Sequence, residues 1–489
     1  MDDVTATRIA DLMEPAFLEL LEGLGPNGDG DPLAIETKMM GMVLAAARSA
    51  YARALEALDD ELCRSLPAGT RIRDRRRRTM GTRLGDVTFV RRTCIDSFGN
   101  TVVPVDDAID LPERARVSPA LEAEVVWLAA ETSYRLASET LARSGASALS
   151  AATVEWCVHR AGRACRDEDE RLAESLFVDG VRPDGKEEAD LLCVESDGTM
   201  VNLQHEGDAK RCEIKAMVAY AGKVGGTGPK DRKVRRIRPV SFGCVGTARQ
   251  MWAQGVAAVG SVYDITKVRT VHSGFDGAGW CEGDVTFLGF AEDVVGHLDP
   301  FHVNRAVARC FDADHAEQRS RALSEVYHGD ARACADLLGS LAAEGSARPS
   351  VVAAVAPYLR AHASCIGVAG PSLGTMEPEN QHVYQSRLSG VPCAWTRRGA
   401  DSMARIRSRQ ASGRVVPRLS RATRITPKAR SRREERIERA LCHGPVASQV
   451  VSSEGRGWEY PTQASTTGYR ADVQFESGLR ADHKLVDPH

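Results

Sequence analysis

Hydrophobic residues recur at helical spacing in the first part of the chain. Residues 4–22 carry an apolar series that includes Ile9, Leu12 and Phe17, and this spacing is typical of an amphipathic helix. The segment PNGDGDP at 26–32 ends this helix, and a second, longer helical pattern runs from about Leu33 to Leu66. We therefore expect a helical N-terminal region over residues 1–70.

Polar and apolar residues alternate with period two at 85–109, on both sides of the turn-forming segment Ser97-Phe98-Gly99-Asn100. Such alternation around a glycine-containing turn predicts a β-hairpin. The arginine-rich run RIRDRRRR stands directly before it, at 71–78. We interpret residues 71–112 as a basic segment followed by a hairpin.

A helical pattern returns at 118–162, where a glycine-bearing turn separates two helices and Ser150 is the expected cap of the second, at about 151–161. This form predicts a helix-turn-helix DNA-binding region over residues 113–180. A plain helical hairpin has the same pattern and remains the alternative. The polar side chains that the second helix would offer to base edges or phosphates are Thr153, Glu155, His159 and Arg160.

Short β-branched runs alternate with helical segments between residues 190 and 300, which predicts an α/β domain. Residues 313–368 are wholly helical in pattern, so we interpret them as an insertion into a domain that spans 185–412. Periodicity is lost beyond Gly413, and residues 413–489 are expected to form a basic, largely disordered tail. The predicted fold class is multidomain α+β.

Composition agrees with a folded chain. Of the 489 residues, 43% are hydrophobic and 27% charged, which favours a multidomain globular protein. The 13 cysteines contain no C-x-x-C pair, which argues against a zinc ribbon and a disulfide framework. Because the chain shows neither a long apolar run nor the order of a signal peptide, we expect a cytoplasmic protein without a membrane partner.

The net charge is close to balance at -3, but its distribution is uneven. Basic blocks occupy 71–78, 230–238 and 396–440, and the last holds fifteen Lys or Arg against four Asp or Glu. A single block is often a solvated face or a tail, whereas three blocks that flank one core favour a phosphate backbone as partner. The DNA-contact candidates in the last two blocks are Arg235, Arg236, Trp395, Arg397 and Arg398. The alternative for Trp395 is burial in the core.

Two aspartates follow short apolar runs in the α/β segment. Asp197 ends LLCVES and Asp276 ends VRTVHSGF. Carboxylates at the ends of neighbouring strands form an oxygen site suited to Mg²⁺ or Mn²⁺, although Asp-Gly after a strand is also a common turn signal. The metal-site interpretation is favoured because Asp299-Pro300-Phe301-His302 and Met376-Glu377 follow in the same domain. The Gly-rich segment 222–231 lacks the phosphate-loop pattern, so nucleotide binding is discounted.

Several segments together resemble a known family, over roughly residues 80–410. They are SPALEAEVVWLAAETSYRLASETL (118–141), SDGTMVNLQ (196–204), EIKAMVAYAG (213–222), FDGAGW (275–280), LDPFHVNRAV (298–307) and MEPENQHVYQSRLSG with CAWTRRGADSMARIR (376–407). In their order and spacing they resemble the bacterial insertion-sequence transposases of the ISLre type, which are related to Mutator-like transposases. The resemblance implies an RNase H-like catalytic core interrupted by the helical insertion.

The resemblance also implies roles for individual residues. Its acidic (DDE) triad, which would hold two Mg²⁺ or Mn²⁺ ions, falls on Asp197, Asp276 and Glu377. The family's Asp-x-x-His signature falls on Asp299 and His302. His302 would either hold Asp299 in place or contact a DNA phosphate. Pro378 follows Glu377 and biases it away from helical geometry, so Glu379 remains a rival for the third acid.

The implied function is a transposase that cuts DNA at terminal inverted repeats and joins the ends to target DNA. Pairing of two element ends implies at least a homodimer, associated with the nucleoid when bound to DNA. Two alternatives remain open from the sequence. One is a transposase-derived DNA-binding protein that has lost catalysis, and the other is an RNase H-like nuclease that cuts without joining.

Overall fold

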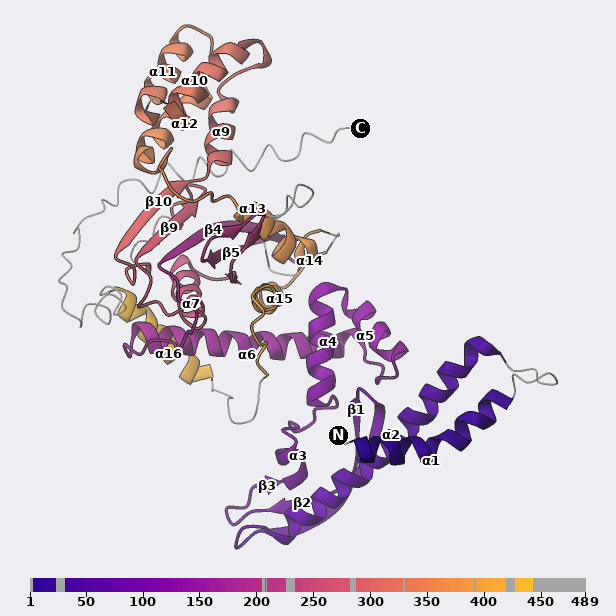
Figure 1. The fold of residues 1–489 in the computed structure, drawn as a ribbon. Coiled ribbons are helices and arrows are strands. Elements are labelled where there is room, and N and C mark those ends of the chain that lie inside the picture. The colour runs from indigo at the N-terminus through magenta and orange to yellow at the C-terminus, as the bar shows by residue number, and fades with distance from the viewer. Residues whose placement is uncertain are drawn as a thin grey trace. The chain divides into compact units, whose positions relative to one another are not determined.

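The computed structural model describes residues 3–22, 31–204, 207, 209–225, 234–281, 287–328, 330–390, 393–418 and 427–442. The described residues form two compact units, one up to Val158 and one from His159 onward. Each combines helices and a sheet (Figure 1), which confirms the predicted multidomain α+β class. No helix within these ranges is long and apolar enough to cross a membrane.

The first unit begins with the two expected helices, α1 (Asp3–Glu22) and α2 (Pro32–Arg64). Next come β1 (Arg71–Thr82), β2 (Gly85–Ile95) and the short β3 (Thr101–Val102), in an antiparallel sheet of that order. Residues such as Met80, Val87 and Phe89 are buried in its core, together with Leu55 of α2.

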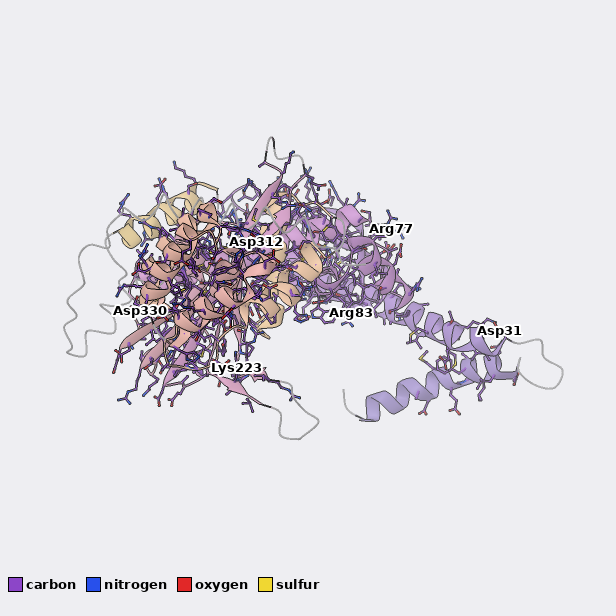
Figure 2. All side chains as sticks on the ribbon, turned by 90° about the horizontal axis from the view of Figure 1, so that it is seen from above. Asp31, Arg77, Arg83, Lys223, Asp312 and Asp330 are labelled. Carbon is purple, nitrogen blue, oxygen red and sulfur yellow. The ribbon has the colours of Figure 1, made fainter. Side chains whose placement is uncertain are left out.

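The arginine run corrects one prediction. Residues 71–78 do not precede a hairpin but form most of β1, which pairs with β2 from end to end. The main hairpin therefore turns between Thr82 and Gly85, and the expected turn at 97–100 joins only β2 to the short β3. The pairing tolerates the charges because most of the β1 side chains face solvent. Exposed Arg77 of β1 and Arg83 of the turn are labelled in Figure 2.

Helices α3 (Pro104–Ala108), α4 (Pro119–Glu131) and α5 (Tyr134–Arg143) follow, and α6 (Ala151–Phe177) begins within the same unit. Ser150 caps α6 as expected, since its Oγ accepts a hydrogen bond of 3.1 Å from Thr153 N. The predicted end of this helix at about 161 is wrong, because α6 has 27 residues and ends at Phe177. The continuation packs its apolar residues, including Leu176 and Phe177, in the core of the second unit.

The second unit is built on a five-stranded sheet in the order β10-β9-β4-β5-β8. Figure 1 labels β10, β9, β4 and β5 of this sheet. Its strands are β4 (Leu191–Asn202), β5 (Arg211–Tyr220), β8 (Val240–Cys244), β9 (Thr270–Phe275) and β10 (Asp293–Leu298). Strand β5 is antiparallel to both β4 and β8, while β9 and β10 run parallel to β4. The carboxyl ends of β4, β8, β9 and β10 therefore lie at one edge. A small ribbon pairs β6 (Lys223–Val224) with β7 (Arg235–Arg236).

A large apolar core lies between this sheet, α6 and α7 (Ala248–Gly260). Trp252 and Val256 of α7 pack with strand residues such as Val194 and Met217. Ile437 of α16 (Pro427–Cys442) joins the same core. The prediction of a disordered tail is thus wrong for 427–442, which form a helix, while 443–489 lie outside the described residues.

A helical block lies between β10 and the end of the domain. It consists of α9 (Pro300–Arg309), η1 (Ala313–His315), α10 (Ala316–His328), α11 (Ala331–Ala343), α12 (Pro349–Ala361) and η2 (Ala363–Cys365). These helices enclose a core of their own, which includes Val303, Leu338 and Leu359. Figure 1 shows them as a group next to β9 and β10. The helical segment expected at about 313–368 thus begins earlier, at Pro300.

The chain then returns to the sheet through α13 (Met376–Glu379), the π-helical turn η3 (Asn380–Gln385) and α14 (Ser386–Leu388). Helix α15 (Arg397–Ala411) packs along β8. These elements matter for function because α13 carries Glu377 and Glu379.

Candidate active site

Three aspartates lie at the level where the parallel strands β9 and β10 end. Asp197 belongs to β4, Asp276 directly follows β9, and Asp299 directly follows β10. All three line one cavity, together with His302 and Glu377. The structure therefore brings together five residues that the sequence analysis identified as candidates. They are spread over the 181 positions from Asp197 to Glu377. Their chemical roles remain predictions.

Asp197 lies within β4 and not at the end of the strand as expected. The strand continues because Gly198 and Thr199 pair with Lys215 and Ile214 of β5. This strand pairing prevents the turn that the Asp-Gly sequence suggests. Asn380 Nδ2 donates a hydrogen bond of 2.7 Å to Asp197 Oδ2. This bond ties the start of η3 to the strand.

Asp276 is held by a tight turn. Its Oδ1 accepts a hydrogen bond of 2.8 Å from Ala278 N, and Gly277 between them has a φ of +90°. A side chain at 277 would also clash, since its Cβ would lie 2.6 Å from the ring of Tyr358. Tyr358 belongs to α12, and its hydroxyl donates to the main-chain oxygen of Asp276 at 3.2 Å. The helical block thus supports the loop that carries this acid.

Asp299 caps α9 by accepting a hydrogen bond of 2.9 Å from Phe301 N. Burial raises the pKa of Asp299 above its usual value, although the Phe301 N–H and His302 act in the opposite direction. The carboxylates of Glu195 and Asp276 raise the pKa further. The cavity therefore concentrates negative charge.

The structure separates the two rivals for the third acid. Glu377 is exposed and lines the cavity, whereas Glu379 is buried and forms an ion pair of 2.6 Å with Arg236. The expected disturbance by Pro378 does not occur, because α13 begins at Met376 and a proline is tolerated in the first turn of a helix. The cavity position belongs to Glu377.

Glu195 is a buried residue that the sequence analysis missed. Its carboxylate accepts hydrogen bonds from Gly374 N and Thr375 N, both 2.7 Å, and from the hydroxyls of Thr375 and Tyr220, both 2.5 Å. These hydrogen bonds hold the segment before α13 against β4. They thereby fix the position of Glu377, which lies two residues after Thr375. A charged residue in the apolar run LLCVES, two positions before Asp197 and hence on its face of the strand, was the available signal.

Lys223 also holds the segment before α13 in place. Its ammonium group donates a hydrogen bond of 3.1 Å to the main-chain oxygen of Leu373, which itself lines the cavity. Lys223 belongs to β6 and is labelled in Figure 2.

The acid cavity is lined by hard oxygen donors. Among the described residues, no three His, Cys, Asp or Glu side chains already lie close enough to share an ion. The cavity nevertheless offers four carboxylates from Asp197, Asp276, Asp299 and Glu377, and these are hard oxygen ligands of the kind that Mg²⁺ and Mn²⁺ take. Burial is the largest cause of the raised pKa of Asp299, and the carboxylates of Glu195 and Asp276 add to it. A bound cation would favour the charged form of this carboxyl group.

Three of the predicted DNA-contact residues meet in a second, larger cavity of about 740 Å³, here called the basic cavity. His159 of α6 lines it together with Arg397 and Arg398 at the start of α15. Arg160 is half-buried on α6, and Arg235 is exposed on β7. Thr153 belongs to the first unit, where its hydroxyl lies 2.9 Å from that of Ser150.

One of the predicted contacts is wrong, and a second residue is engaged within the protein. Trp395 is only 7% exposed and donates a hydrogen bond of 3.1 Å to Leu388 O, so its ring closes the core and cannot stack on a base. Arg236 is engaged by buried Glu379. The basic block 396–440 is also partly structural, because several of its arginines are buried and bonded to protein groups: Arg405, Arg407 and Arg409.

Comparison with known proteins places the chain in a family. It belongs to the uncharacterised protein family UPF0236, whose profile matches residues 34–424. It is 26% identical over 396 residues to the UPF0236 protein in the vanSb 3' region of Streptococcus gallolyticus, covering 78% of this chain and 83% of that protein. It is 23% identical over 381 residues to a UPF0236 protein of Caldanaerobacter subterraneus subsp. tengcongensis, covering 72% and 73%. The name of the latter joins eleven locus designations.

Proposed function

We propose that this protein is a DDE transposase, which cuts DNA at the ends of a mobile element and joins those ends to target DNA. The observation that carries the proposal is the convergence of Asp197, Asp276 and Glu377 on one cavity at the carboxyl edge of the sheet. These are the acids on which the triad falls in the resemblance to ISLre-type transposases.

The order of the strands supports an RNase H-like core. In sequence order, β4, β5 and β8 form an antiparallel meander, and β9 and β10 extend the sheet on the other side of β4, parallel to it. A core of the RNase H type has this order and these directions. The resemblance places the first acid on Asp197, in β4, and the second on Asp276, directly after β9.

The printed name of one relative also bears on the proposal. The Caldanaerobacter relative carries eleven locus designations in one name. A protein encoded at many loci of one organism is what a mobile element leaves as it copies itself. For the present chain this supports an element-encoded function.

The chemistry requires several acids together. Asp197, Asp276 and Glu377 would hold two Mg²⁺ or Mn²⁺ ions, which lower the pKa of the attacking oxygen and take up charge on the leaving oxygen in displacement at phosphorus. The chain's own contribution is to fix the ligands. Asn380 orients Asp197, and the main-chain N–H of Ala278 orients Asp276.

The supporting residues act on the third acid and on the cavity wall. Glu195 anchors the segment that leads to Glu377. Asp299 caps α9, with His302 one turn along the same helix, so we assign these two residues to the support of the cavity and not to metal ligation.

The test is incubation of the purified protein with Mn²⁺ and labelled DNA that carries the sequences flanking its gene. Cleavage at the element end followed by joining to a second DNA supports the proposal. Binding alone indicates a transposase-derived DNA-binding protein, and cleavage without joining indicates a nuclease. Asp197→Asn is expected to remove the activity, and Asp293→Asn is the control because Asp293 is exposed at the opposite, amino end of β10.

A further inference from the structure

Four segments far apart in the sequence converge on the basic cavity. It is formed by α6, β5, the loop from β8 to α7, and the region of α15 and α16. Its basic lining residues are His159, Arg163, Arg166, Lys215, Arg397, Arg398 and Arg430. The basic cavity is therefore created by folding and does not correspond to a single run of basic sequence.

The lining of the basic cavity has an excess of positive charge. Six Lys or Arg side chains line the cavity together with two acids, Glu213 and Asp401. Arg430 also forms an ion pair with Asp167, outside the lining, which leaves an excess of three without His159. The two acids form ion pairs with Lys215 and Arg166 and so hold these cations in place. A concave surface with one sign of charge focuses its field and attracts a polyanion.

The amino end of α7 adds to this field. Thr247 and Gln250, which form the capping box of the 13-residue helix α7, also line the cavity. The positive end of the helix dipole therefore points toward the space between the arginines. Phosphate groups are the anions that helix amino ends and arginines bind together in proteins.

The basic cavity lies at the same edge of the sheet as the acids. Lys215 pairs in register with Gly198 of β4 on one side and with Cys244 of β8 on the other. The loop after β8 is therefore about 10 Å, or two strand spacings, from Asp197 along this edge. Lys215 also lies 4.5 Å from the ring of Trp280, in the segment that follows Asp276.

We infer that the basic cavity binds the phosphodiester backbone of the DNA next to the scissile phosphate. The inference rests on the proposed function, because it takes the acid cavity as the site of cutting. A distance of about 10 Å along the edge corresponds to roughly three nucleotides of duplex DNA at 3.4 Å each. The acids would hold one phosphate while the arginines hold phosphates a few nucleotides away.

The experiment measures binding of fluorescein-labelled duplex DNA by anisotropy in EDTA, over a series of salt concentrations. The double variant Arg397→Gln/Arg398→Gln is compared with Arg319→Gln/Arg321→Gln, which removes two exposed arginines of α10. Loss of two phosphate contacts should weaken binding about tenfold and reduce the slope of log affinity against log salt by roughly 2. The control double variant should match the wild type. Both pairs are exposed, so the melting temperatures should not change.

The outcomes separate this inference from the proposed function. Equal affinity and equal salt slope for the two double variants would overturn the inference, even if the wild type cuts DNA. Reduced affinity and slope for Arg397→Gln/Arg398→Gln, together with no cleavage by the wild type in Mn²⁺, would support phosphate binding by the basic cavity. The same result would overturn both its place next to a scissile phosphate and the proposed transposase function. Absence of DNA binding by the wild type would overturn both.

Discussion

Glu379 and Arg236 form an ion pair of 2.6 Å in which the carboxylate side chain is completely buried. The pair joins α13 to β7, two short elements 143 positions apart. Glu377, two residues earlier, is exposed at the acid cavity. One short helix thus carries a structural glutamate and a candidate metal ligand.

We predict that the two glutamates respond differently to substitution. Glu379→Gln leaves Arg236 without its buried partner and should lower the free energy of unfolding by about 3 kcal/mol. Glu377→Gln should leave the melting temperature unchanged and abolish DNA cleavage. Thermal melts and cleavage assays on both variants test this. Cleavage by Glu377→Gln, with none by a Glu379→Gln protein of native stability, would reassign the third acid.

Glu195 is predicted to position Glu377 without touching the substrate. Glu195→Gln disturbs the bonds to Gly374 and Thr375, and should reduce the single-turnover cleavage rate about a hundredfold, as small misplacements of catalytic groups do. The affinity for DNA in EDTA should not change.

Tyr220→Phe provides the matched control for Glu195. It removes only the hydroxyl that donates to Glu195 and should cost about 1 kcal/mol of stability with little effect on the rate. If both variants lose rate only in proportion to stability, Glu195 has a structural role alone.

Asp401 is expected to make the second unit sensitive to acid. Burial raises the pKa of Asp401, but the guanidinium groups of Arg405 and Arg166 outweigh this and hold the pKa below its usual value. A lowered pKa in the folded state stabilises the protein above the pKa of the unfolded chain, about 3.9. That contribution is lost as the pH falls through the folded value.

Asp401→Asn should therefore destabilise the second unit by about 3 kcal/mol at neutral pH, because Arg405 and Arg166 lose a buried partner. It should also lessen the loss of stability as the pH falls below about 4. Urea unfolding at several pH values, followed by circular dichroism, measures both effects. An unchanged pH dependence would show that other carboxylates control acid unfolding.

The sequence predicted the features that depend on local pattern. Helices α1 and α2 follow apolar spacing, and the Ser150 cap follows helix-start chemistry. The acids Asp276 and Asp299 could be placed because each directly follows a short apolar strand. Parallel neighbouring strands then bring their ends together without further information.

The features that the sequence did not predict depend on distant partners. Residues 71–78 form a strand only because β2 pairs with them, and Arg236 is structural only because Glu379 lies beside it. The role of Glu195 depends on its hydrogen bond from Thr375, which lies 180 positions later. Helix α16 is fixed by the arginines Arg433 and Arg436, which bind Glu174 of α6. No local window of sequence contains such pairs.

The most direct test of the central claim is electron paramagnetic resonance of Mn²⁺ bound to the complex of the protein with DNA. If Asp197, Asp276 and Glu377 hold two ions about 4 Å apart, the wild type should give the signal of a magnetically coupled Mn²⁺ pair, and Asp276→Asn should lose it. An uncoupled Mn²⁺ signal that is identical in the wild type and in Asp276→Asn would contradict the account.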